Sequence, residues 1–418
     1  AECAVVVDQP LAHTRMRALE GGDDVAERAR LDRDLLVAAG QRAHGGGNAN
    51  GHCHGGDATG AIPDSGGRQS ARFDTVSHAD MVAIVPVRRV VPAPDKFKGT
   101  VTAAEEAAAI GHACWELGID CTEVPVADGG DGLLDALGGA NRTSTVTGPL
   151  GDVVDAQWRL SKGTAVIEMA QASGLTVAGG ADGNDPMNAT TTGTGELIDH
   201  ALDAGARRII VGLGGSATTD GGFGAIRAIS AISRLKQVEL LVACDVTTTF
   251  TDAAAVFGPQ KGATRAQVAM LTRRLERLTQ MFLDDFGADV TSIEGGGAAG
   301  GLGGALGALG GTLLPGFELV ADELDLYDHL EGADLVITGE GCLDDTSSDG
   351  KVVGGVASIA AEQGVPVLAI VGSDERTDRS TPADLQVVSL VDEFGEPAAF
   401  AEPKRLIEQA TADWLATR

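Results

Sequence analysis

The sequence predicts an α/β protein with a mainly parallel β-sheet and more than one domain. Short apolar runs alternate with helical patterns from Val87 onward, which is the signature of strands joined by crossover helices. The chain has 418 residues, whereas a single domain usually has about 100–200. Loops rich in Gly and Asp follow several apolar runs, and ligands of open α/β sheets bind beyond the carboxyl ends of the strands.

The apolar runs between turn signals are expected to be strands, and the longer segments with a 3.6-residue period are expected to be helices. The first helix has the clearest start, because Thr102 followed by Glu105 makes the pattern of a capping box. The expected strands are, in order, 87–92, 122–126, 165–168, 208–213, 240–244, 335–338, 367–371 and 386–390. The expected helices are 103–117, 195–204, 265–286, 298–309, 353–362 and 403–417.

Composition excludes several classes of protein. The formal charge is −29, so a nucleic-acid partner is not expected, because binding to phosphates needs a basic face. The six cysteines form no CxxC pair, which favours a reduced, intracellular protein. No apolar run is long enough to span a bilayer and no signal peptide is visible, so we expect a cytoplasmic protein with no membrane partner.

The basic residues are unusual, because only seven of the 31 are lysine. Many acidic residues with few lysines are typical of proteins from salt-loving cytoplasms, where high ionic strength screens the repulsion between surface charges. Codon bias in a GC-rich genome, which replaces Lys by Arg, explains the same composition equally well.

Residues 1–80 differ from the rest of the sequence. Apolar periodicity ends after Ala39, and a Gly-rich stretch with no lysine follows. His52, Cys53 and His54 are adjacent in this stretch, which is a poor arrangement for a closed zinc shell. We therefore expect 1–80 to be a disordered or non-native extension, and the working protein to start near Met81.

Two loops of charged and small residues follow the first two expected strands. APDKFKG, residues 93–99, offers Lys96 or Lys98 to a carboxylate or phosphate, or simply carries solvated charges. In PVADGGDG, residues 125–132, Asp128 and Asp131 flank two glycines. That arrangement suits Mg²⁺ or a substrate hydroxyl, although Asp-Gly pairs are also common in turns.

A third loop, GLGGSATTDGG at 212–222, has the composition of an anion-binding loop. Its small residues let backbone N–H groups and the hydroxyls of Ser216, Thr218 and Thr219 surround an anion. Asp220 is placed to hold a metal or to accept a proton.

Two later loops are weaker signals. Gly295, Gly297 and Gly300 match the dinucleotide pattern GxGxxG, but the preceding segment 289–294 is a poor strand. ADLVITGEGCLDDTSSDGK brings Glu340, Asp344 and Lys351 to a strand end. These side chains suit metal-assisted phosphoryl transfer, and a charged surface turn is an equally open interpretation. A Walker-type P-loop is excluded, because GxxxxGK[ST] does not occur.

Taken in order, these loops resemble those of the type I glycerate kinase family. The likeness runs from about Val87 to Trp414. It rests on APDKFKG, PVADGGDG, TTGTGELI, GLGGSATTDGG, ACDV, VFGPQKGAT, GGGAAGGLG and DLVITGEG. The resemblance implies an ATP- and Mg²⁺-dependent kinase that phosphorylates D-glycerate, usually to 2-phosphoglycerate. It also implies a Rossmann-like domain built from both ends of the chain, 87–150 plus 318–418, with a second α/β domain, 151–317, inserted between them.

The resemblance also implies which residues form the active site, in a cleft between the domains. Lys98 and Lys261 would be charge partners for carboxylate or phosphate, Asp220 the base for the glycerate hydroxyl, and Asp245 and Glu340 ligands of Mg²⁺. Lys351 is a further catalytic candidate. The remaining candidates for substrate or phosphate binding are Asp128, Asp131, Gly214, Gly215, Ser216 and Thr218.

Two departures from the family pattern bear on function. Cys342 stands where the family has an arginine able to bind carboxylate or phosphate with two hydrogen bonds, and 247–249 replaces a Pro-containing turn. A non-catalytic relative of the kinase fold therefore stays open, as does an NAD-dependent dehydrogenase based on GxGxxG. No feature of the sequence predicts an oligomeric state.

Overall fold

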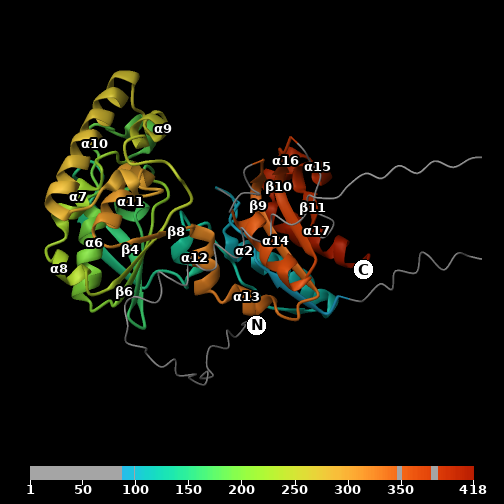
Figure 1. The fold of residues 1–418 in the computed structure, drawn as a ribbon. Coiled ribbons are helices and arrows are strands. Elements are labelled where there is room, and N and C mark those ends of the chain that lie inside the picture. Colours follow the sequence, from blue (N-terminus) through green and yellow to red (C-terminus); the bar gives the residue numbers. More distant parts are fainter. Residues whose placement is uncertain (1–86, 98, 346–350, 378–384) are drawn as a thin grey trace, which may run out of the picture. The chain divides into compact units, whose positions relative to one another are not determined.

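We describe residues 87–97, 99–345, 351–377 and 385–418 of a computed structural model (Figure 1). The expectations for 1–80, the zinc-like histidines and Lys98 lie outside these residues. Within them, no helix is long and apolar enough to cross a membrane.

The first sheet has five parallel strands in the order β11-β10-β9-β1-β2. It combines residues from both ends of the described chain, as the bounds show: β1 is Arg89–Pro92, β2 Asp120–Cys121, β9 Leu335–Leu343, β10 Val367–Asp374 and β11 Leu385–Ser389. In β1, Val90 packs with α2 (Ala103–Leu117) and α17 (Pro403–Leu415) on one face. Its neighbour Val91 packs with α14 (Val352–Gln363) on the other. Burial on both faces explains why these strands read as unbroken apolar runs.

The second sheet has six strands in the order β3-β4-β5-β6-β7-β8. Strands β5 to β8 are parallel, whereas β3 and β4 pair antiparallel with their neighbours. The bounds are β3 Arg142–Thr147, β4 Val153–Ser161, β5 Thr164–Glu168, β6 Arg208–Gly212, β7 Glu239–Ala243 and β8 Thr312–Leu314. Its longer helices are α6 (Thr192–Asp203), α10 (Arg265–Phe286) and α11 (Ala298–Ala308), whose buried side chains join one core with the sheet.

Shorter helices occupy the connections between these elements. They are α3 (Leu133–Ala136), α4 (Ala170–Ser173), α5 (Gly180–Gly183), α7 (Phe223–Ala228), α8 (Ile232–Leu235), α9 (Ala253–Phe257), η1 (Pro259–Lys261), η2 (Val290–Ser292), α12 (Gly316–Glu323), α13 (Leu326–Leu330), α15 (Leu390–Phe394) and α16 (Glu396–Ala401).

The strand expected at 122–126 is wrong, and prolines explain why. The N–H groups of Thr122 and Val124 donate to the carbonyls of Val90 and Pro92, as in a parallel ladder. The return bonds would need N–H groups on Pro92 and Pro94, which proline lacks. The segment therefore runs beside β1, while the assigned strand is limited to Asp120–Cys121.

The boundary expected near residue 150 does not match the sheets, because β3 (Arg142–Thr147) already belongs to the six-stranded sheet. The chain returns to the five-stranded sheet at β9, after β8 and two helices. The division into domains itself stays a prediction.

The GxGxxG segment has neither the strand nor the regular helix of a dinucleotide site. The short 3₁₀ helix η2 precedes Gly295, and φ is positive at Ala299, Gly300 and Gly301 inside α11. A Cβ at Gly300 would lie 2.0 Å from the carbonyl oxygen of Thr218. The glycines here permit close contact with the 212–222 loop, which leaves the dehydrogenase interpretation without structural support.

Candidate active site

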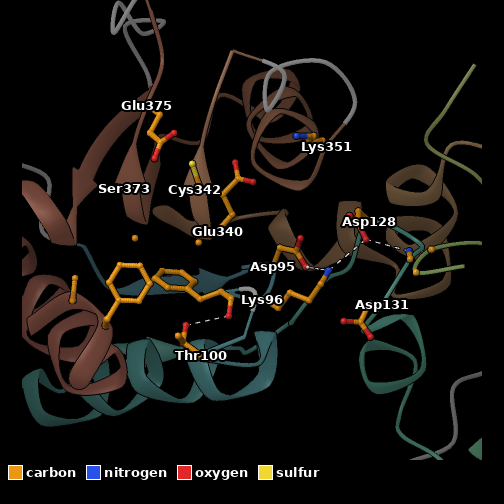
Figure 2. Close-up of a pocket in the computed structure, with 18 of the residues that line it drawn as sticks. Asp95, Lys96, Thr100, Asp128, Asp131, Glu340, Cys342, Lys351, Ser373 and Glu375 are labelled. Atoms are coloured by element: carbon orange, nitrogen blue, oxygen red, sulfur yellow. Dashed lines mark hydrogen bonds and ion pairs between the residues drawn. The ribbon is translucent and has the colours of Figure 1, made fainter. Parts of the chain in front are cut away.

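A cavity of about 740 Å³ lies at the carboxyl ends of β1, β9 and β10 and extends to the 212–222 loop (Figure 2). Most of the expected loops contribute to it, and Figure 2 shows Asp95, Lys96, Asp128 and Asp131 close together at one end, with Glu375 away from them. The charged residues that line it are Asp95, Lys96, Asp128, Asp131, Glu340, Lys351 and Glu375. Apolar side chains that line the cavity include Phe97 and Ala399 of one core cluster, Val391 packed against that cluster, and Phe400, and we call this group the apolar end.

Lys96 is the central cation of the charged end. Its Nζ lies 3.4 Å from Oδ1 of Asp95 and 3.5 Å from Oδ1 of Asp128, and Figure 2 shows it between the two carboxylates. Burial lowers the pKa of Lys96, but Asp128, Asp95 and Asp131 outweigh that effect and raise it. Lys96 is therefore charged at neutral pH and held in the cavity.

Asp95 is the acidic residue that sequence reasoning missed. Its N–H donates to the carbonyl of Gly339 (2.9 Å), which ties the loop after β1 to β9. Burial raises the pKa of Asp95 to about 6, and the charge of Asp128 adds to that effect while Lys96 opposes it. A signal was present in the sequence, because Asp95 precedes a lysine directly after a buried strand.

Glycines bring the 125–132 and 212–222 loops into backbone contact. A Cβ at Gly214 would lie 2.6 Å from Cα of Gly130, and a Cβ at Gly129, where φ is +80°, would lie 2.6 Å from Cα of Gly316. Only glycine tolerates such approach without a shift of the backbone. The contact places Asp128 and Asp131 in the same cavity as Gly214 and Gly215.

The loop after β9 supplies Glu340, Cys342 and Lys351 to the cavity. Nζ of Lys351 lies 3.6 Å from Oδ1 of Asp344, and both side chains are more than one third exposed. Cys342 is exposed and has its thiol where the family arginine was expected. Ser373 and Glu375, at the end of β10, complete this side of the cavity and were not expected.

Asp220 does not line this cavity but a second one, together with Thr190 and Arg274, and its carboxylate accepts several hydrogen bonds. It accepts hydrogen bonds from the backbone N–H groups of Thr191 (2.9 Å), Gly222 (3.1 Å) and Gly224 (3.1 Å) and from the Thr191 hydroxyl. These donors occupy both oxygens of a buried side chain. The geometry argues against the base role expected for Asp220 and favours a role in fixing the loop.

Lys261 is buried behind the same loop, with only 2% of its surface exposed. Its Nζ donates to Oγ of Ser216 (2.8 Å) and to the carbonyl of Thr218 (2.7 Å). Burial lowers the pKa of Lys261 to about 7, although the charge of Asp220 opposes this. The Thr218 hydroxyl donates to the carbonyl of Ala299 (3.3 Å), so it is turned toward the Gly-rich segment.

Asp245 and Glu340 were expected to bind a metal together. Asp245 accepts from the N–H of Gly316 (2.7 Å). Burial raises the pKa of Asp245 to about 6; this hydrogen bond opposes the shift, and the charges of Asp128 and Asp95 add to it. Asp245 thus lies near the charged end of the cavity, while Glu340 lines it directly. Among the described residues, the tight group of three potential metal ligands is elsewhere, at His112, Glu116 and Glu408.

Glu106 is a second acid that the sequence did not single out. It belongs to α2 and is completely buried, and neither of its carboxylate oxygens has a hydrogen-bond partner in the described part of the chain. Burial raises its pKa well above the usual value, and the charges of Asp95 and Glu340 add to that effect. Burial therefore favours the protonated form of this carboxyl group.

Comparisons with known proteins agree on one family. The model of the glycerate kinase family matches residues 90–232 and 229–417. Glycerate 2-kinase of Escherichia coli K12 is 42% identical over an alignment of 325 residues, and the match covers 68% of this chain and 85% of that protein. Glycerate kinase of Bacillus subtilis 168 is 41% identical over 328 residues, covering 69% of this chain and 86% of that protein.

A solved structure shows the same likeness in three dimensions. The crystal structure of a protein described as glycerate kinase 2 from Salmonella typhimurium LT2 superposes with a TM-score of 0.69. The two chains are 37% identical, and the match covers 79% of this chain and 98% of the other.

Proposed function

The chain belongs to the glycerate kinase family, and from this premise we propose that it transfers the γ-phosphoryl group of ATP to a hydroxyl of D-glycerate, with 2-phosphoglycerate favoured. The observation that carries the proposal is the charged end of the cavity. There Lys96 lies between Asp95 and Asp128, beside the backbone of Gly214 and Gly215. Positioned charges and backbone amides supply most of the catalysis in phosphoryl transfer.

The two ends of the cavity suggest how the nucleotide lies. Adenine is flat and apolar, and it suits the end formed by Phe97 and Phe400. The phosphates then point toward Lys96 and Lys351 and toward the N–H groups of the Gly214–Gly215 backbone.

Asp95 is the base in this proposal. A general base works best when its pKa is near the working pH, and burial raises that of Asp95 to about 6. Its carboxylate accepts the proton of the attacking glycerate hydroxyl, while Lys96 balances the negative charge. Asp128 and Asp131 bind glycerate as acceptors for its hydroxyl groups, and Lys98 keeps its proposed role as a charge partner.

Mg²⁺ fits the acidic groups of this cavity. Magnesium prefers carboxylate oxygen and usually enters with nucleotide phosphates, keeping several waters. Asp245 and Glu340 are the proposed partners, direct or through water, and the carboxylates of Asp128 and Asp95 add to the negative charge around Asp245. When bound, the ion neutralises charge on the phosphates.

The setting follows from the same proposal. A kinase of small metabolites with a net charge of −29 suits the cytoplasm, where ATP is abundant, and does not suit nucleic acid.

The direct test is ADP release with D-glycerate as acceptor, measured by a coupled assay with and without Mg²⁺. We expect turnover that depends on both. L-glycerate and NAD⁺ with glycerate serve as controls, and analysis of the product by NMR distinguishes the 2- from the 3-phosphate. Binding of ATP without turnover would instead support the non-catalytic relative.

A further inference from the structure

Lys261 is a buried titratable group to which the proposed reaction assigns no step. It ends η1 and reaches the 212–222 loop from behind, where its Nζ donates to Ser216 and to the carbonyl of Thr218. No carboxylate forms an ion pair with it within the described ranges. A lysine in this environment holds a positive charge poorly, because burial removes water without supplying a direct counter-charge.

The surroundings of Nζ contain little charge. Asp220 in the same loop is the carboxylate whose charge raises the pKa of Lys261. Helix α9, which packs on η1, offers the ring of Phe257 with its centroid 6.0 Å from Nζ and has no charged residue. Helix α5 also packs on η1, and its acidic residue, Asp182, is exposed. The balance favours a pKa of about 7.

Ser216 connects this lysine with the cavity. It directly follows Gly214 and Gly215, which line the cavity, and it is held by a bridge to Gly174. Its oxygen accepts from Lys261 at 2.8 Å, so its own hydrogen is available to a further acceptor. An anion seated on the glycine backbone would provide that acceptor and would also bring the missing counter-charge close to Nζ.

We propose that Ser216 and Lys261 form a proton-linked anion site: when phosphate or carboxylate binds at the 214–216 backbone, Ser216 donates to it and Lys261 takes one proton from solvent. The amine becomes an ammonium ion, and no covalent bond changes. The inference rests on the proposed function for the source of the anion, which is either the nucleotide or glycerate. It explains why a lysine is kept behind a loop that otherwise consists of small neutral residues and Asp220.

Titration calorimetry measures this uptake directly. Binding at pH 8 is recorded in two buffers with different ionisation enthalpies, using inorganic phosphate, D-glycerate and a non-hydrolysable ATP analogue as separate probes. For the full-length protein we expect uptake close to one proton per site with the probe that occupies the loop. Comparison of the three probes identifies whether the nucleotide or glycerate is the source.

Variants separate this role from a structural one. K261M should lose the uptake and bind the anion at least tenfold more weakly, whereas K261R, which is always charged, should bind without uptake. K236M, in the exposed end of α8, is the matched control and should retain the uptake. Variant S216A should weaken anion binding while the protein stays folded.

Unchanged uptake in K261R would overturn the proposal, as would binding by the native protein without uptake, or no binding of any of the three probes at millimolar concentration. Failure of the kinase proposal would give a different result from failure of the anion-site proposal. In that case proton-linked anion binding would persist, but ADP would not be released with D-glycerate.

Discussion

At the scale of single residues, the proposed role of Asp95 as the base predicts how kcat depends on pH. Because the carboxylate form accepts the proton, kcat should fall below pH 6 by about tenfold per pH unit and level off above it. D95N should lower kcat about 10²- to 10⁴-fold and retain ATP binding. Steady-state kinetics between pH 5 and 9, with ATP affinity measured separately, checks both expectations.

The control for Asp95 is D182N, which removes an exposed carboxylate far along the chain in α5 and should leave kcat unchanged. D220N offers a sharper contrast. It should lower stability because the backbone donors of Thr191, Gly222 and Gly224 lose a charged acceptor. If the fall in kcat below pH 6 persisted in D95N and disappeared in D220N, Asp220 rather than Asp95 would be the base.

The burial of Glu106 leads to a prediction about stability rather than catalysis. Its pKa is raised in the folded state, so the folded protein binds the proton more tightly than the unfolded chain does. The stability linked to that proton is complete below the unfolded pKa, near 4.5, and is lost as pH rises toward the folded pKa. E106Q avoids this loss, so its free energy of unfolding relative to the native protein should increase as pH rises from 5 to 8.

Urea unfolding at several pH values measures this difference. E105Q, one residue earlier, is the matched control with the opposite sign, because the bonds from Lys404 and Thr102 lower the pKa of Glu105. Its stability relative to the native protein should decrease as pH rises through the Glu105 pKa. A pH-independent effect of E106Q would show that Glu106 is not protonated in the folded protein.

At the scale of elements, the interrupted start of α11 is the feature most open to test. Gly300 has φ of +68° and its missing Cβ leaves room for the carbonyl of Thr218. G310A supplies the matched control, because Gly310 has φ of +96° and open space around it. We expect G310A to cost about 1–2 kcal/mol from backbone strain alone, and G300A at least about 1 kcal/mol more from the added collision.

Urea midpoints and ADP release together test this pair of variants. G300A should also disturb catalysis, because the carbonyl that it displaces belongs to Thr218, which accepts from Lys261. Equal losses of stability in G300A and G310A would show that the contact between α11 and the 212–222 loop adds nothing to the cost of the G300A substitution.

The sequence predicted elements well where they are buried on both sides. The unbroken apolar runs of β6 and β7 were found within one residue, and β10 was found at its start but extends three residues beyond the expected end. Strands β3 and β4 were missed because several of their positions are polar and exposed, so their apolar pattern is weak; β3 is an edge strand and β4 lies next to it.

The residues of the candidate site could be predicted from the sequence only in part. Motifs identified the loops, because glycines at turns and acids after strands leave a local signal. Which acid faces the cavity depends on packing between distant loops, and for this reason Asp95 was not among the expected site residues. Phe400 and Glu375 carry no motif at all, since only the fold brings them to the cavity.

At the scale of the whole molecule, the cavity's two unlike ends predict separate effects on the two substrates. Phe400 is 66% exposed although it is large and apolar, and it borders the end proposed for adenine. F400A should raise KM for ATP about tenfold, equivalent to about 1.4 kcal/mol of lost apolar contact, and leave KM for D-glycerate unchanged. Initial rates with each substrate varied in turn provide the measurement.

F223A is the control, because Phe223 is also partly exposed but lines a different cavity. A rise in KM for D-glycerate with no change for ATP would mean that the nucleotide lies in the reverse direction.

The pairing of β1 with β9 has a consequence for how the chain assembles during synthesis. Val90 pairs with Leu335 in the middle of the five-stranded sheet, so β1 emerges from the ribosome long before its central partner exists. The six-stranded sheet uses only residues from the intervening stretch and can close first. Until translation reaches β9 and β10, the apolar face of β1 has no permanent cover, and this interval is when a chaperone would be most useful to the nascent chain.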